Sequence, residues 1–277
     1  MGNGNTTFSN QRIFLFILIL CSLCALILSL LTLGLTSKQK RAEELYRSRQ
    51  LLLAASLINY DGELLPSGTG KATSEEILVL FKERIRPYLT DAQGKLYTFE
   101  ALNIDEEIYL KENEKLGYAQ LPYKLLFIVL DREGSERPYG YVIPVNGYGL
   151  WDAIYGYLGV KGDGDTVLGM TWYQQKETPG LGGEIALPEW QKQFLGKELF
   201  RKNSEGKTLI KQAALRIQVV KTTVKETYGN SPLGDSAVDG IPGASITVMG
   251  VNEALRTSLA PYRPFLERAY KNEVILP

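Results

Sequence analysis

The longest apolar stretch of the chain covers residues 13–35 and contains no charged side chain. At about 1.5 Å per residue, a helix of this length reaches roughly 34 Å, enough to cross a bilayer with some tilt. The apolar regions of signal peptides are shorter and end at a small-residue cleavage site, whereas this stretch runs through Thr36 and Ser37 into Lys38. The pattern therefore predicts one uncleaved transmembrane helix over residues 13–35, after a short polar tail over residues 1–12.

Apolar residues return at helical spacing directly after this span. They predict a helical stalk over residues 38–58, whose apolar positions are Leu45, Leu51, Leu52, Ala55 and Ile58. A second helix is expected over residues 75–88, with Ser74 as its N-cap. A third, short helix is expected over residues 187–196, closed by Gly196.

Four further apolar stretches have the length and composition of β-strands. They cover residues 124–131, 140–145, 165–173 and 213–220. Strands and helices are mixed along the chain without the strict alternation of a βαβ fold, so the sequence predicts the α+β class.

Composition excludes several kinds of function. The chain has 31 basic residues (lysine and arginine) and 31 acidic residues (aspartate and glutamate), so its formal net charge is zero. A neutral chain without a basic block argues against nucleic acid as a partner. The chain has no histidine, so a Ser-His-Asp triad and a histidine-ligated haem are impossible. Cys21 and Cys24, the two cysteines, lie in the apolar span, where we expect them to fill one helix face. The rest of the chain therefore has neither a disulfide nor a thiolate metal site.

Three glycine-bearing segments follow residue 140. They cover residues 147–156, 177–185 (ETPGLGGEI) and 239–247 (DGIPGASIT). Glycine allows a backbone to approach a flat or phosphorylated ligand closely, but none of the three has the spacing of a P-loop or a dinucleotide-binding fingerprint. Taken singly, each segment is typical of a tight surface turn.

Together the three segments, with the N-terminal span, resemble the family of the C subunit of the sodium-translocating NADH:quinone reductase. They are more distantly similar to the G subunit of the Rnf-type electron-transport complex. The resemblance implies an FMN-binding core over residues 140–258, with one FMN attached through its phosphate by a flavin transferase. Residues 36–139 would then form the stalk and the N-terminal part of the soluble domain, and residues 259–277 a C-terminal segment.

The family's attachment motif reads Asp-x-x-Ser/Thr-Gly-Ala-Thr. Asp239, Gly243 and Ala244 match it, Pro242 replaces the first hydroxyl residue, and Ser245 replaces the acceptor threonine. Serine keeps the side-chain hydroxyl that a phosphoester requires, so the resemblance implies Ser245 as the attachment residue.

The local sequence fits this assignment. Proline and glycine at the centre of residues 241–244 predict a type II turn that presents Ser245 at its exit. A helix is expected to begin near Val248, with its N-terminal amides close to the phosphate. Thr247 is the alternative acceptor, or else the N-cap of that helix.

Flavin rings need a flat apolar slot and a few polar groups. We expect Trp151, Trp172 and Tyr173 to flank the ring, although core packing is an equal alternative for the two tryptophans. The resemblance implies that the loop containing Gly180 and Leu181 lies against the ring. Side chains that would hydrogen-bond the ring edge are Glu177 and Thr178.

The resemblance implies that the chain is an electron carrier rather than a complete enzyme. Its FMN would take electrons derived from NADH and pass them to a further flavin on the way to quinone, within a complex that exports sodium. The span over residues 13–35 has no charged side chain, so the ion path would lie in partner subunits. Two alternatives stay open: the G subunit of an Rnf-type complex, which uses ferredoxin in place of quinone, and a flavin-free, membrane-anchored binding module.

Orientation in the inner membrane rests on two conflicting indications. Arg12 precedes the span, whereas the basic residues that follow it are Lys38, Lys40, Arg41, Arg47 and Arg49. The positive-inside rule alone would place the following domain in the cytoplasm. The resemblance implies the periplasmic side, and we favour it because large domains and assembled complexes outweigh flanking charge.

Overall fold

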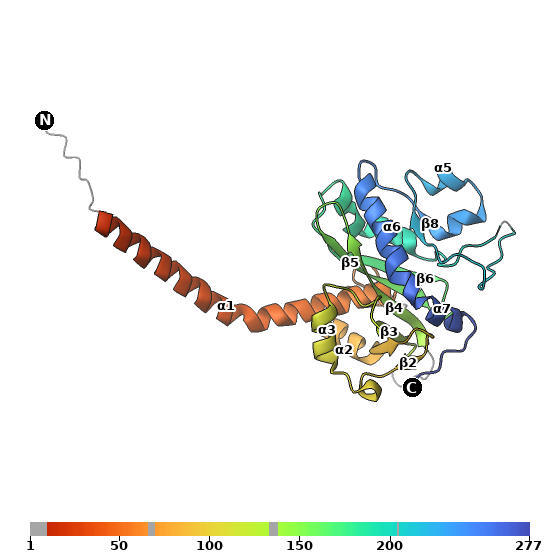
Figure 1. Cartoon of the computed structure of the whole chain (residues 1–277), viewed down its shortest axis with the longest axis horizontal. Coiled ribbons are helices and arrows are strands. Elements are labelled where there is room, and N and C mark those ends of the chain that lie inside the picture. Colours follow the sequence, from red (N-terminus) through yellow and green to blue (C-terminus); the bar gives the residue numbers. More distant parts are fainter. Residues whose placement is uncertain (1–9, 66–69, 133–137, 204) are drawn as a thin grey trace. The chain divides into compact units, whose positions relative to one another are not determined.

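The computed structural model describes residues 10–65, 70–132, 138–203 and 205–277. The chain divides into two compact units, Met1–Arg47 and Ser48–Pro277 (Figure 1). Helix α1 (Asn10–Ala54) contains the predicted span and most of the predicted stalk. Within the described ranges it is the one helix long and apolar enough to cross a membrane, with a mean hydropathy of 3.1 in its most apolar window.

The stalk helix ends at Ala54 rather than at the predicted residue 58. Ser56 adopts a left-handed backbone (φ 54°), its N–H donates to the Leu53 carbonyl, and the Leu57 N–H donates to the Leu52 carbonyl. This pair of hydrogen bonds is the Schellman arrangement that closes helices. The last residues of the helix are buried in the Ser48–Pro277 unit, so this part of the stalk belongs to its core.

The Ser48–Pro277 unit is built on an antiparallel sheet of six strands in the order β2-β1-β3-β4-β5-β6. The strands are β1 (Ile85–Thr90), β2 (Leu96–Tyr97), β3 (Lys124–Leu130), β4 (Pro138–Tyr148), β5 (Ala153–Lys161) and β6 (Val167–Gln174). The strands predicted over residues 124–131, 140–145 and 165–173 are confirmed, and β4 is longer than expected. Strand β5 was not predicted, because its tyrosines and glycines break the apolar run.

Helices cover both faces of this sheet. A Cβ atom at Gly147 of β4 would lie 2.5 Å from the Cβ of Ala254, so helix α6 (Ser245–Leu259) packs on that face. Gly159 of β5 points to the other face, where its Cα approaches the backbone carbonyl of Ala54. The C-terminal end of α1 and helix α6 therefore bury opposite faces of one sheet, as alternating strand residues allow.

The helix predicted over residues 75–88 is shorter than expected. Helix α2 (Ser74–Arg84) is capped by Thr73, not Ser74, because Thr73 and Glu76 form a capping box. The chain then turns directly into β1, where Pro87 pairs within the sheet and the residue before it is extended. Helix α3 (Glu106–Asn113) and the 3-10 turn η1 (Glu100–Leu102) lie between β2 and β3.

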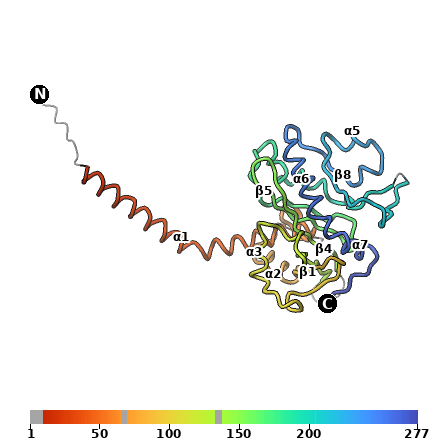
Figure 2. The backbone as a smooth tube through the Cα atoms, in the orientation of Figure 1, coloured from red at the N-terminus to blue at the C-terminus, as the bar shows by residue number. Residues whose placement is uncertain are grey.

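Between β6 and α6 the chain is mostly irregular, and its path can be followed in Figure 2. The predicted helix over residues 187–196 is present as α4 (Pro188–Gln191) and η3 (Lys192–Phe194), with Gly196 in a left-handed conformation just beyond. The strand predicted over residues 213–220 is reduced to β7 (Gln218–Val219), because the Ala213 and Arg216 N–H groups bond to the loop carbonyls of Leu209 and Leu199. The remaining elements are η2 (Gly182–Ala186), α5 (Val224–Tyr228), η4 (Pro232–Ser236), β8 (Ala237–Val238), which pairs with β7 in parallel, η5 (Ala260–Tyr262) and α7 (Arg263–Tyr270).

Candidate functional site

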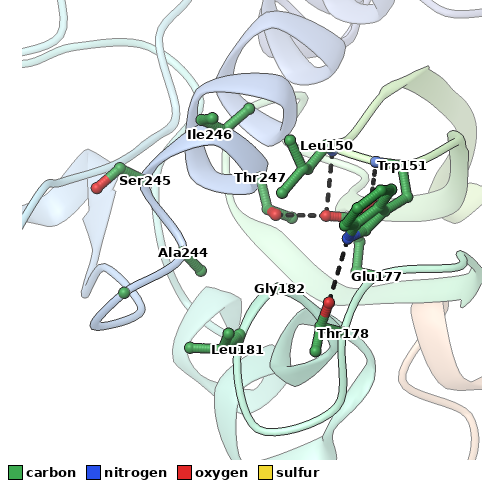
Figure 3. Close-up of a pocket in the computed structure, with 11 residues that line it drawn as sticks. Leu150, Trp151, Glu177, Thr178, Leu181, Gly182, Ala244, Ser245, Ile246 and Thr247 are labelled. Atoms are coloured by element: carbon green, nitrogen blue, oxygen red, sulfur yellow. Dashed lines mark hydrogen bonds between the residues drawn. The ribbon is translucent and has the colours of Figure 1, made fainter.

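The three glycine-bearing segments meet at one pocket of about 260 Å³ beside the N-terminus of α6 (Figure 3). The β4–β5 turn, the loop after β6 and the first turn of α6 each contribute to its wall. The lining residues are Leu150, Trp151, Glu177, Thr178, Leu181, Gly182, Gly243, Ala244, Ser245, Ile246 and Thr247. Segments far apart in sequence therefore form a single site.

The first segment is a β-hairpin whose connection is tight, as its glycines predict. The Gly149 N–H donates to the carbonyl of Asp152, which closes the connection between β4 and β5. Trp151 projects from this turn with 68% of its surface exposed, and its indole N–H donates to the Thr178 hydroxyl at 3.1 Å. An exposed tryptophan held by a hydrogen bond is well suited to forming one wall of a slot for a flat ligand.

The second segment forms a turn after β6. The Leu181 and Gly183 N–H groups both donate to the Thr178 carbonyl, and Gly180 has a positive φ of 76°. Leu181 is 43% exposed and lines the pocket, whereas Gly180 lies at the turn with open space around it and is not among the lining residues.

The third segment contains the predicted type II turn. The Ala244 N–H donates to the Ile241 carbonyl at 3.1 Å, and Gly243 has the positive φ that this turn requires at its third position. Helix α6 then begins at Ser245, three residues earlier than expected. Ala244 is the N-cap and provides no side-chain hydrogen bond, so Thr247 is not the cap that the sequence predicted.

The two hydroxyls in the first turn of α6 differ in environment. Ser245 is exposed, and Figure 3 shows its side chain directed away from Thr247 and Glu177. Thr247 is 2% exposed, and its hydroxyl donates a short hydrogen bond to Oε2 of Glu177.

Glu177 is the charged group of the pocket, although only 5% of its surface is exposed. Its carboxylate also accepts the N–H groups of Leu150 at 3.1 Å and Trp151 at 2.9 Å. Burial alone would raise the pKa of Glu177, but the hydrogen bonds from Thr247 and from the β4–β5 turn lower it below its ordinary value. The group is therefore a carboxylate whose oxygens are already engaged by the protein.

Trp172 and Tyr173 lie elsewhere. Trp172 is 1% exposed within the core beneath α6, so core packing describes it, and it does not line the pocket. Tyr173 stacks on Tyr157, with ring centroids 4.8 Å apart. Consecutive strand residues point to opposite faces, so these two could not have flanked the same ring.

The sequence did not single out two of the lining residues, Leu150 and Ile246. Leu150 and Ile246 are about half exposed, and each is the immediate neighbour of a residue that was selected. Large apolar side chains at exposed turn and helix-start positions were the available signal, because such positions usually carry polar residues.

Most of the glycines serve protein packing rather than ligand approach. A Cβ at Gly149 would lie 2.5 Å from Oε1 of Glu177, and one at Gly182 would lie 2.7 Å from Oε2. A Cβ at Gly243 would lie 2.9 Å from Leu181 at the pocket wall. Glycine density thus marks close approach of the three segments to one another around Glu177.

The donor set of the pocket fits an FMN phosphate and ring. The first intrahelical hydrogen bond of α6 runs from the Val248 N–H to the Ala244 carbonyl, so the amides of residues 245–247 point out of the helix N-terminus. Such amides favour a phosphate. The exposed side chains of Trp151 and Leu181 provide apolar surface for a ring, and Thr178 adds a polar group at its edge.

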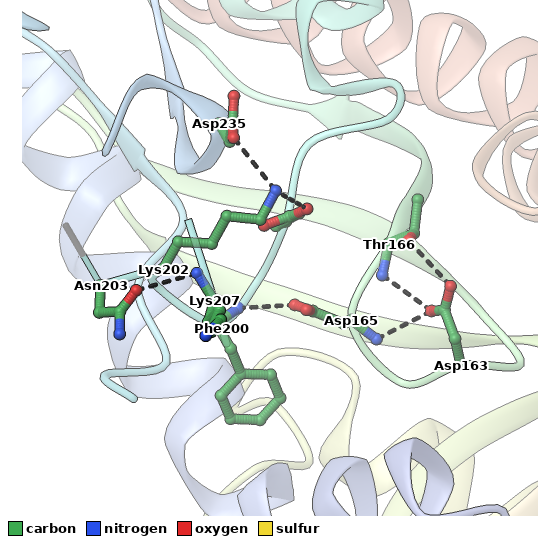
Figure 4. Close-up of polar contacts among 9 residues, drawn as sticks. Asp163, Asp165, Thr166, Phe200, Lys202, Asn203, Lys207 and Asp235 are labelled. Carbon is green, nitrogen blue, oxygen red and sulfur yellow. Dashed lines mark hydrogen bonds and ion pairs between the residues drawn. The ribbon is translucent and has the colours of Figure 1, made fainter. Parts of the chain in front are cut away.

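A second polar cluster lies outside this pocket (Figure 4). Asp165, 7% exposed, accepts the Phe200 N–H at 2.8 Å, and Asp163 accepts the N–H groups of Asp165 and Thr166. Burial raises the pKa of Asp165 to about 6; the Phe200 hydrogen bond opposes this shift, and the nearby charges of Glu198 and Asp163 add to it. The cluster ties the β5–β6 turn to the loop containing Phe200.

Comparison with known proteins gives a consistent result. A family model described as an FMN-binding domain matches residues 149–260. The chain is 40% identical to the C subunit of the Na(+)-translocating NADH-quinone reductase of Chlamydia pneumoniae, across 91% of this chain and 89% of that protein. It is 31% identical to the protein of the same name from Vibrio vulnificus (strain YJ016), across 88% of this chain and 89% of that protein.

Solved structures agree. The crystal structure of the corresponding C subunit from Parabacteroides distasonis is similar with a TM-score of 0.57 and 29% identity, over 84% of this chain and 96% of that one. The crystal structure of Shewanella oneidensis NqrC is similar with a TM-score of 0.55 and 25% identity, over 84% of this chain and 99% of that one. These names favour the C subunit of the sodium-translocating reductase over the Rnf-type G subunit and over a flavin-free module. The three predicted segments meet at one pocket, and the similarity to these relatives extends along nearly the whole chain. The chain therefore belongs to the family of the C subunit of Na(+)-translocating NADH-quinone reductase.

Proposed function

We propose that this chain carries one FMN covalently, through a phosphoester to Ser245. As a member of its family, the chain is the flavin-carrying subunit of a Na(+)-translocating NADH-quinone reductase and works with the other subunits of that oxidoreductase. The observation that carries the proposal is the position of Ser245: its hydroxyl is exposed, at the first residue of α6, on the wall of the pocket.

Burial argues against Thr247 as the acceptor. Its hydroxyl already donates to Glu177 and is closed off from solvent, so a transferase could reach it only after the first turn of α6 had opened. Opening this turn would also leave a buried carboxylate without one of its donors, which costs roughly 1–3 kcal/mol. Ser245 needs no such rearrangement.

Attachment joins Oγ of Ser245 to the phosphorus of FMN. The bond between that phosphorus and the rest of the flavin donor breaks, the hydroxyl proton leaves with the group that the transferase displaces, and the peptide gains the mass of FMN less one water. Pro242 and Gly243 hold the acceptor at the exit of a type II turn, and the α6 amides would neutralise part of the phosphate charge.

Bound FMN supplies the exchange of electrons between NADH-derived reductant and a further flavin on the path to quinone. The residues of this chain supply position and surroundings. Trp151 and Leu181 would lie against the ring and exclude water from it, while Thr178 would offer a polar group at its edge. Sodium transport would rest on partner subunits, since residues 13–35 carry no charged side chain.

The apolar part of α1 anchors the chain in the membrane as a single pass. We place the flavin domain on the periplasmic side of the inner membrane. The implied family topology supports this side, and the basic residues after the span oppose it; large domains translocate largely regardless of flanking charge.

The test is mass mapping of the tryptic peptide that covers residues 226–256, from protein made together with a flavin transferase. We expect the wild-type peptide to carry one FMN less one water, and Ser245→Ala to lose this mass while the protein stays folded, because an exposed side chain contributes little packing energy. Ser245→Thr should retain the flavin, since it restores the threonine of the family motif.

Thr247→Ala is the matched control. It should keep the covalent flavin and lower stability by about 1–3 kcal/mol through the lost hydrogen bond to Glu177. If Thr247→Ala loses the flavin and Ser245→Ala keeps it, the attachment residue is Thr247. A wild-type peptide that never gains the mass contradicts covalent attachment altogether.

A further inference from the structure

Glu177 lies where the three walls of the pocket meet. Its Oε1 accepts the Trp151 N–H at 2.9 Å, and its Oε2 accepts both the Leu150 N–H at 3.1 Å and the Thr247 hydroxyl (Figure 3). One carboxylate thus joins the loop after β6 to the β4–β5 turn and to the first turn of α6.

Two glycines pack closely against this carboxylate. Gly149 and Gly182 approach it so closely that a Cβ atom on either would lie within 2.7 Å of a carboxylate oxygen. Bonds to a charged acceptor are about twice as strong as neutral ones. The three contacts therefore form a charge-assisted junction.

The junction requires a carboxylate in particular. All three partners donate, and a carboxylate can accept from each of them. A carboxamide of the same shape would turn its NH₂ group toward the N–H of either Trp151 or Leu150, and two donors would face one another. Glutamine is thus a near-isosteric probe that disrupts this junction.

Packing does not determine the orientation of Trp151, since 68% of the side chain is exposed. Its backbone N–H is held by Glu177 and its indole N–H by Thr178. The position of this apolar wall therefore depends on polar contacts to the loop after β6.

We infer that Glu177 is a positioning residue of the flavin slot: its carboxylate sets the separation of Trp151 from the first turn of α6, so that the indole and Ser245 border the same space. Glu177 acts through these two walls rather than as a ligand of the ring edge. The inference rests on the proposed function for the identity of the ligand, and on the described geometry for the junction.

The first experiment needs no flavin. The full-length chain in detergent micelles is labelled with 5-fluorotryptophan, and its three tryptophans give ¹⁹F resonances, of which Trp151 is assigned by its loss in Trp151→Phe. In Glu177→Gln we expect the Trp151 resonance to shift and broaden. The buried Trp172 and Trp190 serve as internal references and should keep their positions.

Glu184→Gln is the matched control. It removes one negative charge from the same loop, but Glu184 accepts the Gly180 N–H at 3.1 Å, a bond that a carboxamide oxygen can keep, and it does not line the pocket. We expect wild-type resonances from this variant. Equal Trp151 resonances in Glu177→Gln, Glu184→Gln and the wild type would overturn the inference.

The second experiment uses FMN-loaded protein of verified peptide mass. Displacement of the indole should raise the flavin fluorescence of Glu177→Gln toward the level of Trp151→Ala, with visible circular dichroism altered and attachment retained. If Glu177→Gln does not fold, the same flavin measurements are made on Thr247→Val. This variant removes the hydrogen bond from α6 to the carboxylate and keeps the two bonds from the Leu150 and Trp151 N–H groups. An unchanged flavin signal in Thr247→Val then contradicts the inference.

The proposed FMN attachment and the positioning role of Glu177 can be contradicted independently of each other. Absence of FMN from the wild-type peptide contradicts the proposed attachment but leaves the ¹⁹F comparison valid. Normal attachment with an unperturbed Trp151 resonance in Glu177→Gln contradicts the positioning role alone.

Discussion

Side chains of the same chemical type differ in exposure or in pKa in this molecule because their hydrogen-bond partners and surroundings differ. Ser245 and Thr247 both offer a hydroxyl at the start of α6, but only Ser245 is exposed, because Thr247 is turned inward toward Glu177. Likewise Glu177 and Asp165 are both buried carboxylates with opposite behaviour. Several donors lower the pKa of Glu177, whereas burial and neighbouring negative charges raise that of Asp165.

Asp165 should make stability depend on pH in an unusual direction. Its pKa is about 6 in the folded chain and about 3.9 when unfolded, so the folded state binds the proton more tightly. Stability should therefore fall by roughly 1–2 kcal/mol as the pH rises from about 4 to about 6. Asp165→Asn keeps an oxygen for the Phe200 N–H and should remove this slope in thermal unfolding of the full-length chain.

Glu189→Gln provides the control for Asp165→Asn. Glu189 is exposed and pairs with Lys192 at the surface, so its replacement should leave the slope intact. Glu177 acts with the opposite sign, because the stability that its lowered pKa provides is complete only above its unfolded pKa of about 4.3, so the slope above about pH 5 reports mainly on Asp165. A slope that survives in Asp165→Asn would assign the pH dependence to another group.

Helix α1 has two roles along its length. Its apolar part is exposed, while Leu51, Leu52 and Ala54 at its C-terminal end are buried against the sheet. The boundary between membrane anchor and domain core thus falls inside one continuous helix.

Truncation should reveal this boundary. Removal of residues 1–37 should give a soluble, folded domain that still accepts FMN, since the described core begins at Ser48. Removal of residues 1–54 should prevent folding, because each fully buried leucine contributes about 2–3 kcal/mol and domains are stable by only about 5–15 kcal/mol. Circular dichroism and flavin fluorescence on a denaturing gel report both outcomes, and a colourless, unfolded product of the shorter deletion would contradict this architecture.

Topology of the chain in the membrane is a property of the whole molecule. With the flavin domain on the periplasmic side, protease added to cells with a permeabilised outer membrane should degrade the domain. A cytoplasmic protein serves as the control for an intact inner membrane. Complete protection of the domain would place it in the cytoplasm, as the basic residues after the span predict on their own.

Local pattern was sufficient for the elements that depend on local chemistry. Apolar length predicted the membrane helix, uninterrupted apolar runs predicted β3 and β6, and the Pro-Gly pair predicted the type II turn before Ser245. The glycine segments and the attachment motif selected most of the residues that line the pocket. Each of these signals arises within a few consecutive residues, so no knowledge of distant contacts was needed.

Tertiary contacts decided the rest. Thr247 became a buried donor rather than a cap because α6 starts at Ser245 and turns it toward a glutamate 70 residues earlier in the chain. Trp172 lies in the core because pairing of β6 with β5 turns it to the buried face of the sheet, whereas Trp151 lies in the β4–β5 turn and stays exposed at the pocket. The roles of the glycines and of Glu177 likewise depend on contacts among three separate segments of the chain. A buried carboxylate is stable only where several donors converge on it, and a local sequence pattern does not show which donors these are.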